Sequence, residues 1–372
     1  MIAIDLQVRT VSPDNSVWRL FPGAGYRFLD SFMDDGIGYL DFPGLTLPTG
    51  KPLDKVANLI PLIALSAAYK ERLPSEPDAK NIVLREKDFA NAKHTQSRGR
   101  LRQALINFYQ TAKSGDLVVL PEPLYTRDVW IGEFVGSTVR YSPYYRRPFD
   151  VTVPSRKIRW LSKVKENSLS PILSEALRHQ HPFTLVERSR FLEIMSLAYS
   201  SFIFKDHHVA TIYNGDDFLN TDSSFIGNLS KLAAAGCLAH DSNKSGLGND
   251  LLDILLGDQE IDYTCSQESD IHSPGFTRLI GGSLVAIVTV ALLVSLIELS
   301  KTNSKTQIQQ SILAAEFINT SPDADPACTA KVSQISKNIL LSIGIDKTMK
   351  LCKSAREAAD RAKLRSTAKP FK

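Results

Sequence analysis

LIGGSLVAIVTVALLVSLI, residues 279–297, is the stretch of this 372-residue sequence that decides the expected fold. Its nineteen residues carry no charge, and they lie between Arg278 and Glu298. A helix rises 1.5 Å per residue, so it needs about 20 residues to cross the ~30 Å hydrocarbon core of a bilayer. Small residues such as Gly281 and Gly282 suit contacts between membrane helices. We therefore expect a transmembrane helix over 279–297.

The same stretch has a second interpretation as a buried core element. Its VAIVTV part is rich in β-branched residues, which also favour a central strand, and a helix buried inside a globular protein is apolar as well. Core helices usually keep a polar stripe, however, and this stretch has none. The membrane helix is therefore the preferred prediction, with a buried core element as the alternative.

The orientation in the membrane follows from the flanking sequence. The N-terminus MIAIDLQVRTVSPDNS lacks a secretory signal, so we expect an inner-membrane protein whose N-terminal part, 1–278, is cytoplasmic. The basic tail would instead be cytoplasmic by the positive-inside rule. An outward tail would allow Cys328 and Cys352 to oxidise to a disulfide, and a re-entrant or buried hairpin would keep both sides inside. These alternatives stay open.

The formal net charge of +4 conceals three blocks of opposite sign. Residues 1–200 hold 27 Lys/Arg against 21 Asp/Glu, residues 201–278 hold 4 against 12, and residues 301–372 hold 13 against 6. The content of 43% hydrophobic and 23% charged residues is that of a globular protein, which excludes disordered, collagen-like and coiled-coil chains. We infer that the three blocks belong to different parts of the protein.

The first part of the chain has the pattern of a small curled β-barrel. Short runs rich in β-branched and aromatic residues (VWRLF, GIGYLDF, GDLVVLP, VWIGEFVG and RKIRWL) are bounded by Gly, Pro or Asp. Apolar residues at helical spacing predict helices over 53–70 and 98–112. Because these segments do not form repeated βαβ units, we predict an α+β fold. A small curled β-barrel with helices is followed by a mainly helical region, one transmembrane helix and a helical tail.

Familiar catalytic motifs do not occur in the sequence. It contains no GxSxG, no GxxxxGK[ST], no GxGxxG after a strand and no HExxH, and its four cysteines lack zinc-site spacing. Asp216, Asp217 and Asp222 are assigned to a turn and a helix cap. We predict a non-enzymatic protein with no catalytic residues, no metal site and no cofactor. A nuclease with an unrecognised site in 201–270 is an open alternative.

Aromatic and arginine residues are interleaved in the first part of the chain, most densely in YSPYYRR at 141–147. A flipped base is held by stacking and by hydrogen bonds to its polar edge, while the flanking phosphates require positive charge. Core packing is the alternative role for Trp18, and a solvated helix face is the alternative for the arginines of RGRLR. The candidate nucleic-acid-binding residues are Trp18, Arg19, Tyr26, Arg98, Arg100, Trp130, Tyr141, Tyr144, Tyr145, Arg146 and Arg147.

The order of several short motifs resembles a known sensor family. The motifs are WRLFPG at 18–23, GDLVV at 115–119, IGEF at 131–134 and IRWL at 158–161. They are similar to the pattern of the EVE-like domain, a PUA-superfamily, YTH-related module at the N-terminus of Mrr-like modification-dependent restriction and phage-defence proteins. The sequence departs from the family at 39–42, where YLDF stands in place of the IGW of many members that read modified bases.

The resemblance implies a non-enzymatic component of prokaryotic antiviral defence. Its EVE-like domain would sense modified DNA or another nucleic acid and signal to the membrane segment. A protein-interaction subunit that docks a partner effector of the same defence operon is an open alternative, and homo-oligomerisation is also expected. The predicted parts are the EVE-like recognition domain 1–165, the helical and acidic connector 166–278, the transmembrane helix 279–297 and the helical basic tail 298–372.

Overall fold

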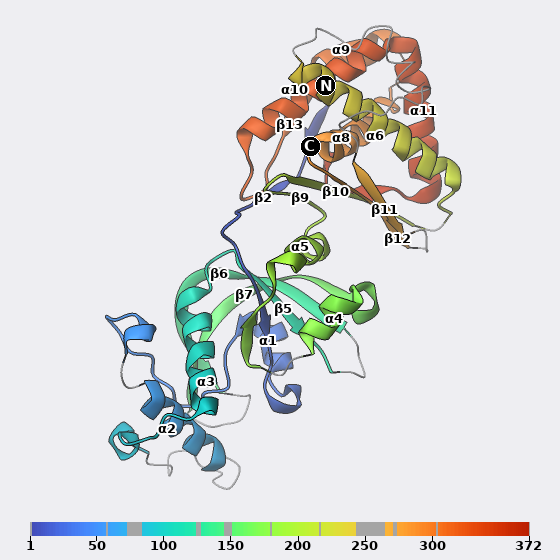
Figure 1. The fold of residues 1–372 in the computed structure, drawn as a ribbon. Coiled ribbons are helices and arrows are strands. Elements are labelled where there is room, and N and C mark those ends of the chain that lie inside the picture. The colour runs from blue at the N-terminus through green and yellow to red at the C-terminus, as the bar shows by residue number, and fades with distance from the viewer. Residues whose placement is uncertain are drawn as a thin grey trace. The chain divides into compact units, whose positions relative to one another are not determined.

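The computed structural model is a mixed α/β protein divided into two compact units (Figure 1). Unit 1 comprises Met1–Pro13 and Tyr199–Lys372, and unit 2 comprises Asp14–Ala198. The first residues of the chain thus fold with its C-terminal half, and residues 166–198 fold with the N-terminal sheet. The described residues are 2–56, 59–72, 84–123, 128–144, 151–178, 181–215, 217–242, 265–270, 274–302 and 304–371.

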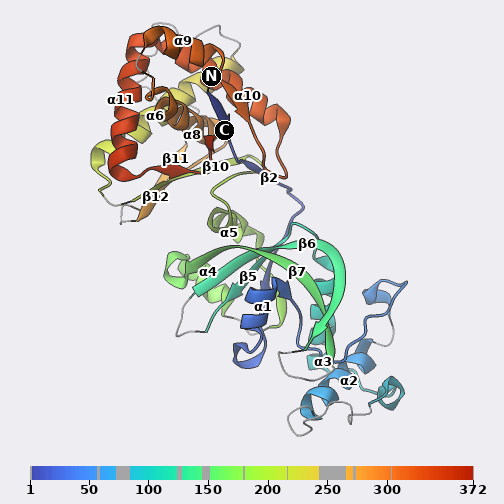
Figure 2. The same cartoon turned by 180° about the vertical axis from the view of Figure 1, so that it is seen from behind.

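Unit 2 is built on a curled six-stranded sheet that forms a half-barrel (Figure 2). The two longest strands bend through register shifts at Ile131/Gly132 and Phe134/Val139, which strengthen the local twist. The sequence predicted a small curled β-barrel for this part of the chain, and the structure has a curled half-barrel sheet in its place. In the order β4-β7-β6-β5-β3-β8, the strands are Ile37–Gly38, Thr152–Lys165, Asp128–Pro143, Leu117–Pro121, Val17–Leu20 and Phe183–Leu185.

The helices of unit 2 close an aromatic core against this sheet. The side chains of Phe28, Phe32 and Phe108 are fully buried. The predicted arginine-rich helix is present as α3, which begins after an N-cap: the Thr95 hydroxyl accepts a hydrogen bond from the Arg98 backbone N–H. The helices are α1 Leu29–Asp35, α2 Leu59–Arg72, α3 Gln96–Ile106, α4 Pro171–Leu177 and α5 Phe191–Ala198, and a π-helical turn Asn107–Thr111 follows α3.

Unit 1 contains two sheets, although this part of the chain was predicted to be mainly helical. The smaller sheet has the order β13-β1-β15, and the larger has the order β11-β12-β10-β9-β2, with β14 beside the end of β10. The strands are β1 Ala3–Asp5, β2 Arg9–Val11, β9 Ser201–Phe204, β10 His207–Asn214, β11 Ser266–Asp270, β12 Gly275–Gly281, β13 Glu316–Ile318, β14 Arg365–Ser366 and β15 Lys369–Pro370. The helices are α6 Asn220–Asp241, α8 Val285–Leu299, α9 Lys305–Leu313, α10 Pro326–Ile343 and α11 Ile345–Ala362.

The apolar stretch 279–297 is not a transmembrane helix. Its first three residues end strand β12, the chain then turns, and α8 begins only at Val285. Helix α8 has 15 residues. Its length is therefore roughly 22 Å, which is shorter than the ~30 Å hydrocarbon core. Within the described ranges, no helix is both long enough and apolar enough to cross a membrane. The transmembrane helix and the inner-membrane location that the sequence predicted are therefore wrong.

Helix α8 lies at the centre of unit 1, and this position explains why its sequence is apolar (Figure 1). It packs against α6, α10, α11 and strand β10, and nearly all its side chains are buried. Its buried hydroxyls stay within the helix: Thr289 Oγ1 donates to the Val285 carbonyl and Ser295 Oγ to the Ala291 carbonyl, both at 2.7 Å. A helix enclosed in this way needs no polar stripe, so the buried-core alternative holds.

Candidate functional site

Both predicted tryptophans have their indole nitrogens hydrogen-bonded to carboxylates of unit 2. Trp18 is buried, its Nε1 donates to Asp116 Oδ2 at 2.8 Å, and its ring stacks on Phe183. Trp130 is half-buried, and its Nε1 donates to Glu122 Oε1 at 2.6 Å. Trp18 is therefore a core residue, whereas Trp130 keeps part of its ring at the surface.

Arg19 and Tyr144 are buried and engaged with other groups of unit 2. Arg19 Nε donates to the Leu177 carbonyl at 2.7 Å, and its Nη1 donates to the His181 carbonyl at 2.8 Å. Burial lowers the pKa of Arg19 to about 10, which leaves it cationic at neutral pH. The Tyr144 hydroxyl donates to Asp41 Oδ1 at 2.7 Å, and burial raises the pKa of this phenol well above its usual range. Arg19 therefore connects β3 to the segment around Leu177 and His181, and Tyr144 connects the end of β6 to the loop that carries Asp41.

The remaining predicted residues are more accessible, and they lie in separate parts of the unit. Arg100 is exposed on α3, and Arg98 on the same helix is half-buried with its Nη1 bonded to a backbone carbonyl at 2.8 Å. Tyr141 is 47% exposed near the end of β6, and Tyr26 is half-buried in the turn after β3. Three further predicted residues lie outside the described residues: Tyr145, Arg146 and Arg147.

Asp41, which the sequence did not single out as a binding residue, is the centre of a polar cluster. Its Oδ2 accepts from Arg27 Nη2 and from Lys70 Nζ, both at 2.5 Å, and its Oδ1 accepts from the Tyr144 hydroxyl. The Arg27 guanidinium also lies over the Phe28 ring at 4.8 Å. Hydrogen bonds between a carboxylate and cations are short and strong, so this cluster holds the Asp41 side chain in place.

Asp41 and Lys70 form the polar part of a small pocket, which we call the Asp41 pocket. Its volume is about 230 Å³, and α2, α3 and the loops next to β3 and β8 supply its walls. Gly23 has φ +79°, and a Cβ there would stand 2.5 Å from the Phe28 ring, so only glycine lets this wall form. The lining residues are Phe21, Gly23, Ala24, Asp41, Phe42, Ile63, Ala67, Lys70, Leu101 and Pro182.

The acceptor capacity of Asp41 is not exhausted by this cluster. A carboxylate offers about four lone-pair positions, and Arg27, Lys70 and Tyr144 use three of them. The remaining position is on Oδ1, and the Asp41 side chain is 17% exposed. The pocket can therefore take a small planar group whose edge carries an N–H donor. The sequence contained one signal of this pocket: Asp41 and Phe42 belong to the YLDF stretch, which departs from the pattern of the EVE-like family.

Of the acidic residues assigned to a turn and a helix cap, the structure describes Asp217 and Asp222. Asp222 is buried and caps α6 as predicted, since its Oδ2 accepts from the Leu219 backbone N–H at 2.9 Å, while its Oδ1 pairs with Arg361. Asp217 is exposed on the loop before α6, and Asp216 lies outside the described residues. In the described part of the chain, no group of three or more His, Cys, Asp or Glu residues is placed to hold a metal ion.

Comparison of the chain with protein-family models, with curated proteins and with solved structures finds no match. The resemblance to the EVE-like family therefore stays a prediction from short motifs. The four motifs that carry it overlap strands β3, β5, β6 and β7 of the curled sheet. The function must be argued from the two units themselves.

Proposed function

We propose that unit 2 binds nucleic acid and holds one base, in its modified form, in the Asp41 pocket. The observation that carries this proposal is the Asp41 carboxylate, held by two cations, with one acceptor position left on the wall of an otherwise mostly apolar pocket. A role in antiviral defence rests on the sequence resemblance alone.

The size of the Asp41 pocket supports a single small planar group. Sites for drug-sized ligands occupy about 300–1,000 Å³, and this pocket is smaller at about 230 Å³. Enzymes and readers that act on one base take it out of the stack and enclose it between apolar or aromatic side chains. Phe21, Phe42 and Ile63 provide such walls here.

The polar groups of the pocket match the edge of a base. Amino and imino groups of bases donate hydrogen bonds, and Asp41 Oδ1 is an acceptor for one of them. Ile63 and Ala67 add apolar surface to the lining of the pocket, which suits an added methyl group better than a polar one. The pocket thus favours a base that donates at one edge and is apolar at another.

The surroundings of the pocket supply moderate positive charge for the flanking phosphates. Lys70 and Arg27 adjoin Asp41, and α3, whose Leu101 lines the pocket, carries Arg98 and Arg100. Unit 2 as a whole holds 26 Lys/Arg and 20 Asp/Glu, so its excess charge is small. We expect binding that depends on salt but is weak unless a base occupies the pocket.

Titration of the full-length chain against labelled single-stranded DNA and RNA, plain and with methylated bases, tests this function. Wild-type protein should bind more weakly as salt rises, and Lys70→Gln should weaken binding and reduce the salt slope by about one. Asp41→Asn should make the affinities for different bases more similar, because the substitution removes a carboxylate that Arg27 and Lys70 hold in place. Lys113→Gln is the matched control, since Lys113 is exposed in unit 2 and does not line the pocket.

Two results would overturn the proposal. One is the absence of binding to every oligonucleotide at low salt by the folded wild-type chain. The other is an equal loss of affinity in Lys70→Gln and Lys113→Gln, which would mean that the Asp41 pocket is not where nucleic acid binds.

A further inference from the structure

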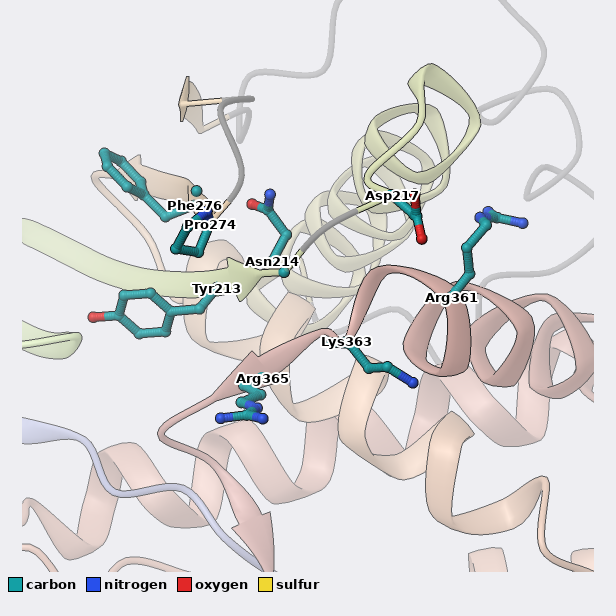
Figure 3. Close-up of a pocket in the computed structure, with 10 residues that line it drawn as sticks. Tyr213, Asn214, Asp217, Pro274, Phe276, Arg361, Lys363 and Arg365 are labelled. Atoms are coloured by element: carbon teal, nitrogen blue, oxygen red, sulfur yellow. The ribbon is translucent and has the colours of Figure 1, made fainter.

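A larger pocket lies in unit 1, where strand β10 ends (Figure 3). Strands β12 and β14 flank the last residues of β10, and the final turn of α11 closes one side. The volume is about 650 Å³, which is within the ~300–1,000 Å³ of typical small-molecule sites. The lining residues of this pocket, which we call the Arg365 pocket, are Tyr213, Asn214, Gly215, Asp217, Pro274, Gly275, Phe276, Arg361, Lys363 and Arg365.

Positive charge is concentrated on one wall of the Arg365 pocket. Arg361, Lys363 and Arg365 follow one another at the end of α11 and the start of β14, and all three residues are exposed. Arg361 pairs with buried Asp222, and Lys363 Nζ donates to a backbone carbonyl at 2.7 Å. Asp217 is the one carboxylate among the lining residues. The wall therefore keeps an excess of positive charge that suits an anion.

Cations at the end of a helix have an ordinary structural explanation, because they complement the helix dipole. That explanation covers Arg361, in the last turn of α11, and Lys363 just beyond it. It does not cover Arg365, which lies in β14 opposite Tyr213 of β10. The basic wall thus extends past the helix end along the edge of the pocket.

Asn214 gives independent evidence that the pocket is built for a ligand. The residue is 4% exposed, and neither its Oδ1 nor its Nδ2 has a hydrogen-bond partner among the described residues. Figure 3 shows this side chain on the pocket wall, with Pro274 on one side and the loop of Asp217 on the other. A buried amide without partners is unfavourable, and such groups in native structures call for an explanation. A ligand that both donates and accepts hydrogen bonds would supply it.

Two aromatic rings stand beside the basic wall. Tyr213 of β10 pairs directly with Phe276 of β12 on one side and with Arg365 of β14 on the other. Residues opposite each other on neighbouring strands share a face of the sheet, so the three side chains form one row. Tyr213 is 41% exposed, its hydroxyl is hydrogen-bonded to the Ser200 hydroxyl, and the Arg278 guanidinium lies over the Phe276 ring at 4.6 Å. Asn214 is the next residue of β10, so its side chain leaves the opposite face of the sheet, and the row contributes Arg365 to the rim of the pocket rather than a surface for the group that meets Asn214.

We propose that the Arg365 pocket binds a free nucleotide. Its phosphate lies against Lys363 and Arg365 at the end of β10, and the edge of its base pairs with the Asn214 amide. Gly275, opposite Asn214 in the β10–β12 pair, has no side chain and leaves room at this point. This site is separate from the Asp41 pocket and does not depend on the function proposed for unit 2.

The probes are AMP, GMP, CMP, UMP and inorganic phosphate, each titrated calorimetrically into the full-length chain. At least one nucleotide should bind, and inorganic phosphate should bind at least about tenfold more weakly because it has no base edge to pair with Asn214. Arg365→Gln and Lys363→Asn should each weaken nucleotide binding about tenfold, the loss expected for one charge-assisted contact. The backbone at 363 is left-handed, with φ 50°. Asparagine is chosen there because it tolerates this conformation.

Lys353→Gln on α11 is the matched control. Lys353 is exposed, its replacement removes the same charge, and it does not line the pocket. Equal binding of phosphate and nucleotides would overturn the nucleotide assignment. Absence of nucleotide binding, or an equal loss in Lys353→Gln, would overturn the site itself.

Asn214→Leu separates a ligand-binding role from a structural one. Leucine replaces two unpaired polar atoms with apolar groups of similar size, so the thermal midpoint of the free protein should stay unchanged or rise. The upward shift of the midpoint that a bound nucleotide produces should be lost. A lower midpoint with nucleotide binding retained would overturn the role of Asn214. If the variant does not fold, the two surface variants at 363 and 365 still decide the site.

Discussion

Replacing Leu292 with alanine tests the position of α8 most directly. Leu292 is fully buried at the centre of unit 1, with 0% exposure. The change removes three carbon groups, each worth about 0.8 kcal/mol of burial, or roughly 2.4 kcal/mol in total. A cavity is also left among α6, α10 and α11, which pack against α8. We therefore expect the free energy of unfolding to fall by about 3–5 kcal/mol.

Urea unfolding of the full-length chain, followed by far-UV circular dichroism, measures this loss. All three tryptophans of the sequence, Trp18, Trp130 and Trp160, lie in unit 2, so their fluorescence reports on that unit and separates the two transitions. Leu313→Ala is the matched control, because Leu313 ends α9 in the same unit and is 61% exposed. Its replacement should lower the free energy of unfolding by less than about 0.5 kcal/mol.

The reasoning is refuted if the two leucine variants lose similar free energies of unfolding. In that case α8 would not be enclosed by the other helices of unit 1, and its apolar composition would need another explanation. An unchanged m-value in Leu292→Ala should accompany the loss of stability, because the surface exposed on unfolding is nearly the same.

Three further predictions concern buried polar groups. The buried Arg156 guanidinium donates to the carbonyls of Phe108 and Ala112 at 2.6 and 2.8 Å. Arg156→Met should therefore destabilise unit 2 by about 2 kcal/mol or more, measured as a lower midpoint of tryptophan fluorescence; an unchanged midpoint would contradict this. Burial disfavours ionisation of Asp5, but hydrogen bonds from Thr320 and Gln7 outweigh it and lower the pKa of Asp5 below 3.8. The Asp5 carboxylate therefore stabilises the folded state above pH 3.8, and this stabilisation is lost as the pH falls through the pKa of Asp5 in the folded protein. Acid unfolding of unit 1 should consequently be less steep in Asp5→Asn than in wild type. Burial raises the pKa of Cys237 and of Cys352 to about 12. In the folded chain both should react with iodoacetamide at pH 8 more than about tenfold more slowly than in urea; equal rates would contradict their burial.

The curled sheet of unit 2 could be predicted because its signals are local. Each strand is a short β-branched or aromatic run between turn residues, and α3 begins at a threonine cap. The three charge blocks, in contrast, are not a local signal. The acidic residues 201–278 and the basic residues 301–372 fold into one unit, which holds 18 Lys/Arg and 20 Asp/Glu, so their succession along the chain marks no boundary in space.

The candidate site could be predicted only in part. An aromatic or arginine residue in a strand-like run is equally suited to a surface or to a core, and burial separates Trp18 and Arg19 from Tyr141. The Asp41 pocket joins residues from five segments, and no spacing along the chain relates Asp41 to Lys70. The Arg365 pocket is similar, since β10, β12 and β14 meet only in the folded sheet.

The sequence by itself determined that residues 279–297 avoid water, because nineteen uncharged residues cannot be left exposed without a large cost in free energy. It did not determine which apolar environment receives them, since a bilayer and a protein core have nearly the same preference for leucine, valine and isoleucine. Only the tertiary structure decided this. Strand β12 takes the first residues, a turn shortens the helix to 15 residues, and α6, α10, α11 and β10 surround α8 so that the protein itself provides the apolar environment.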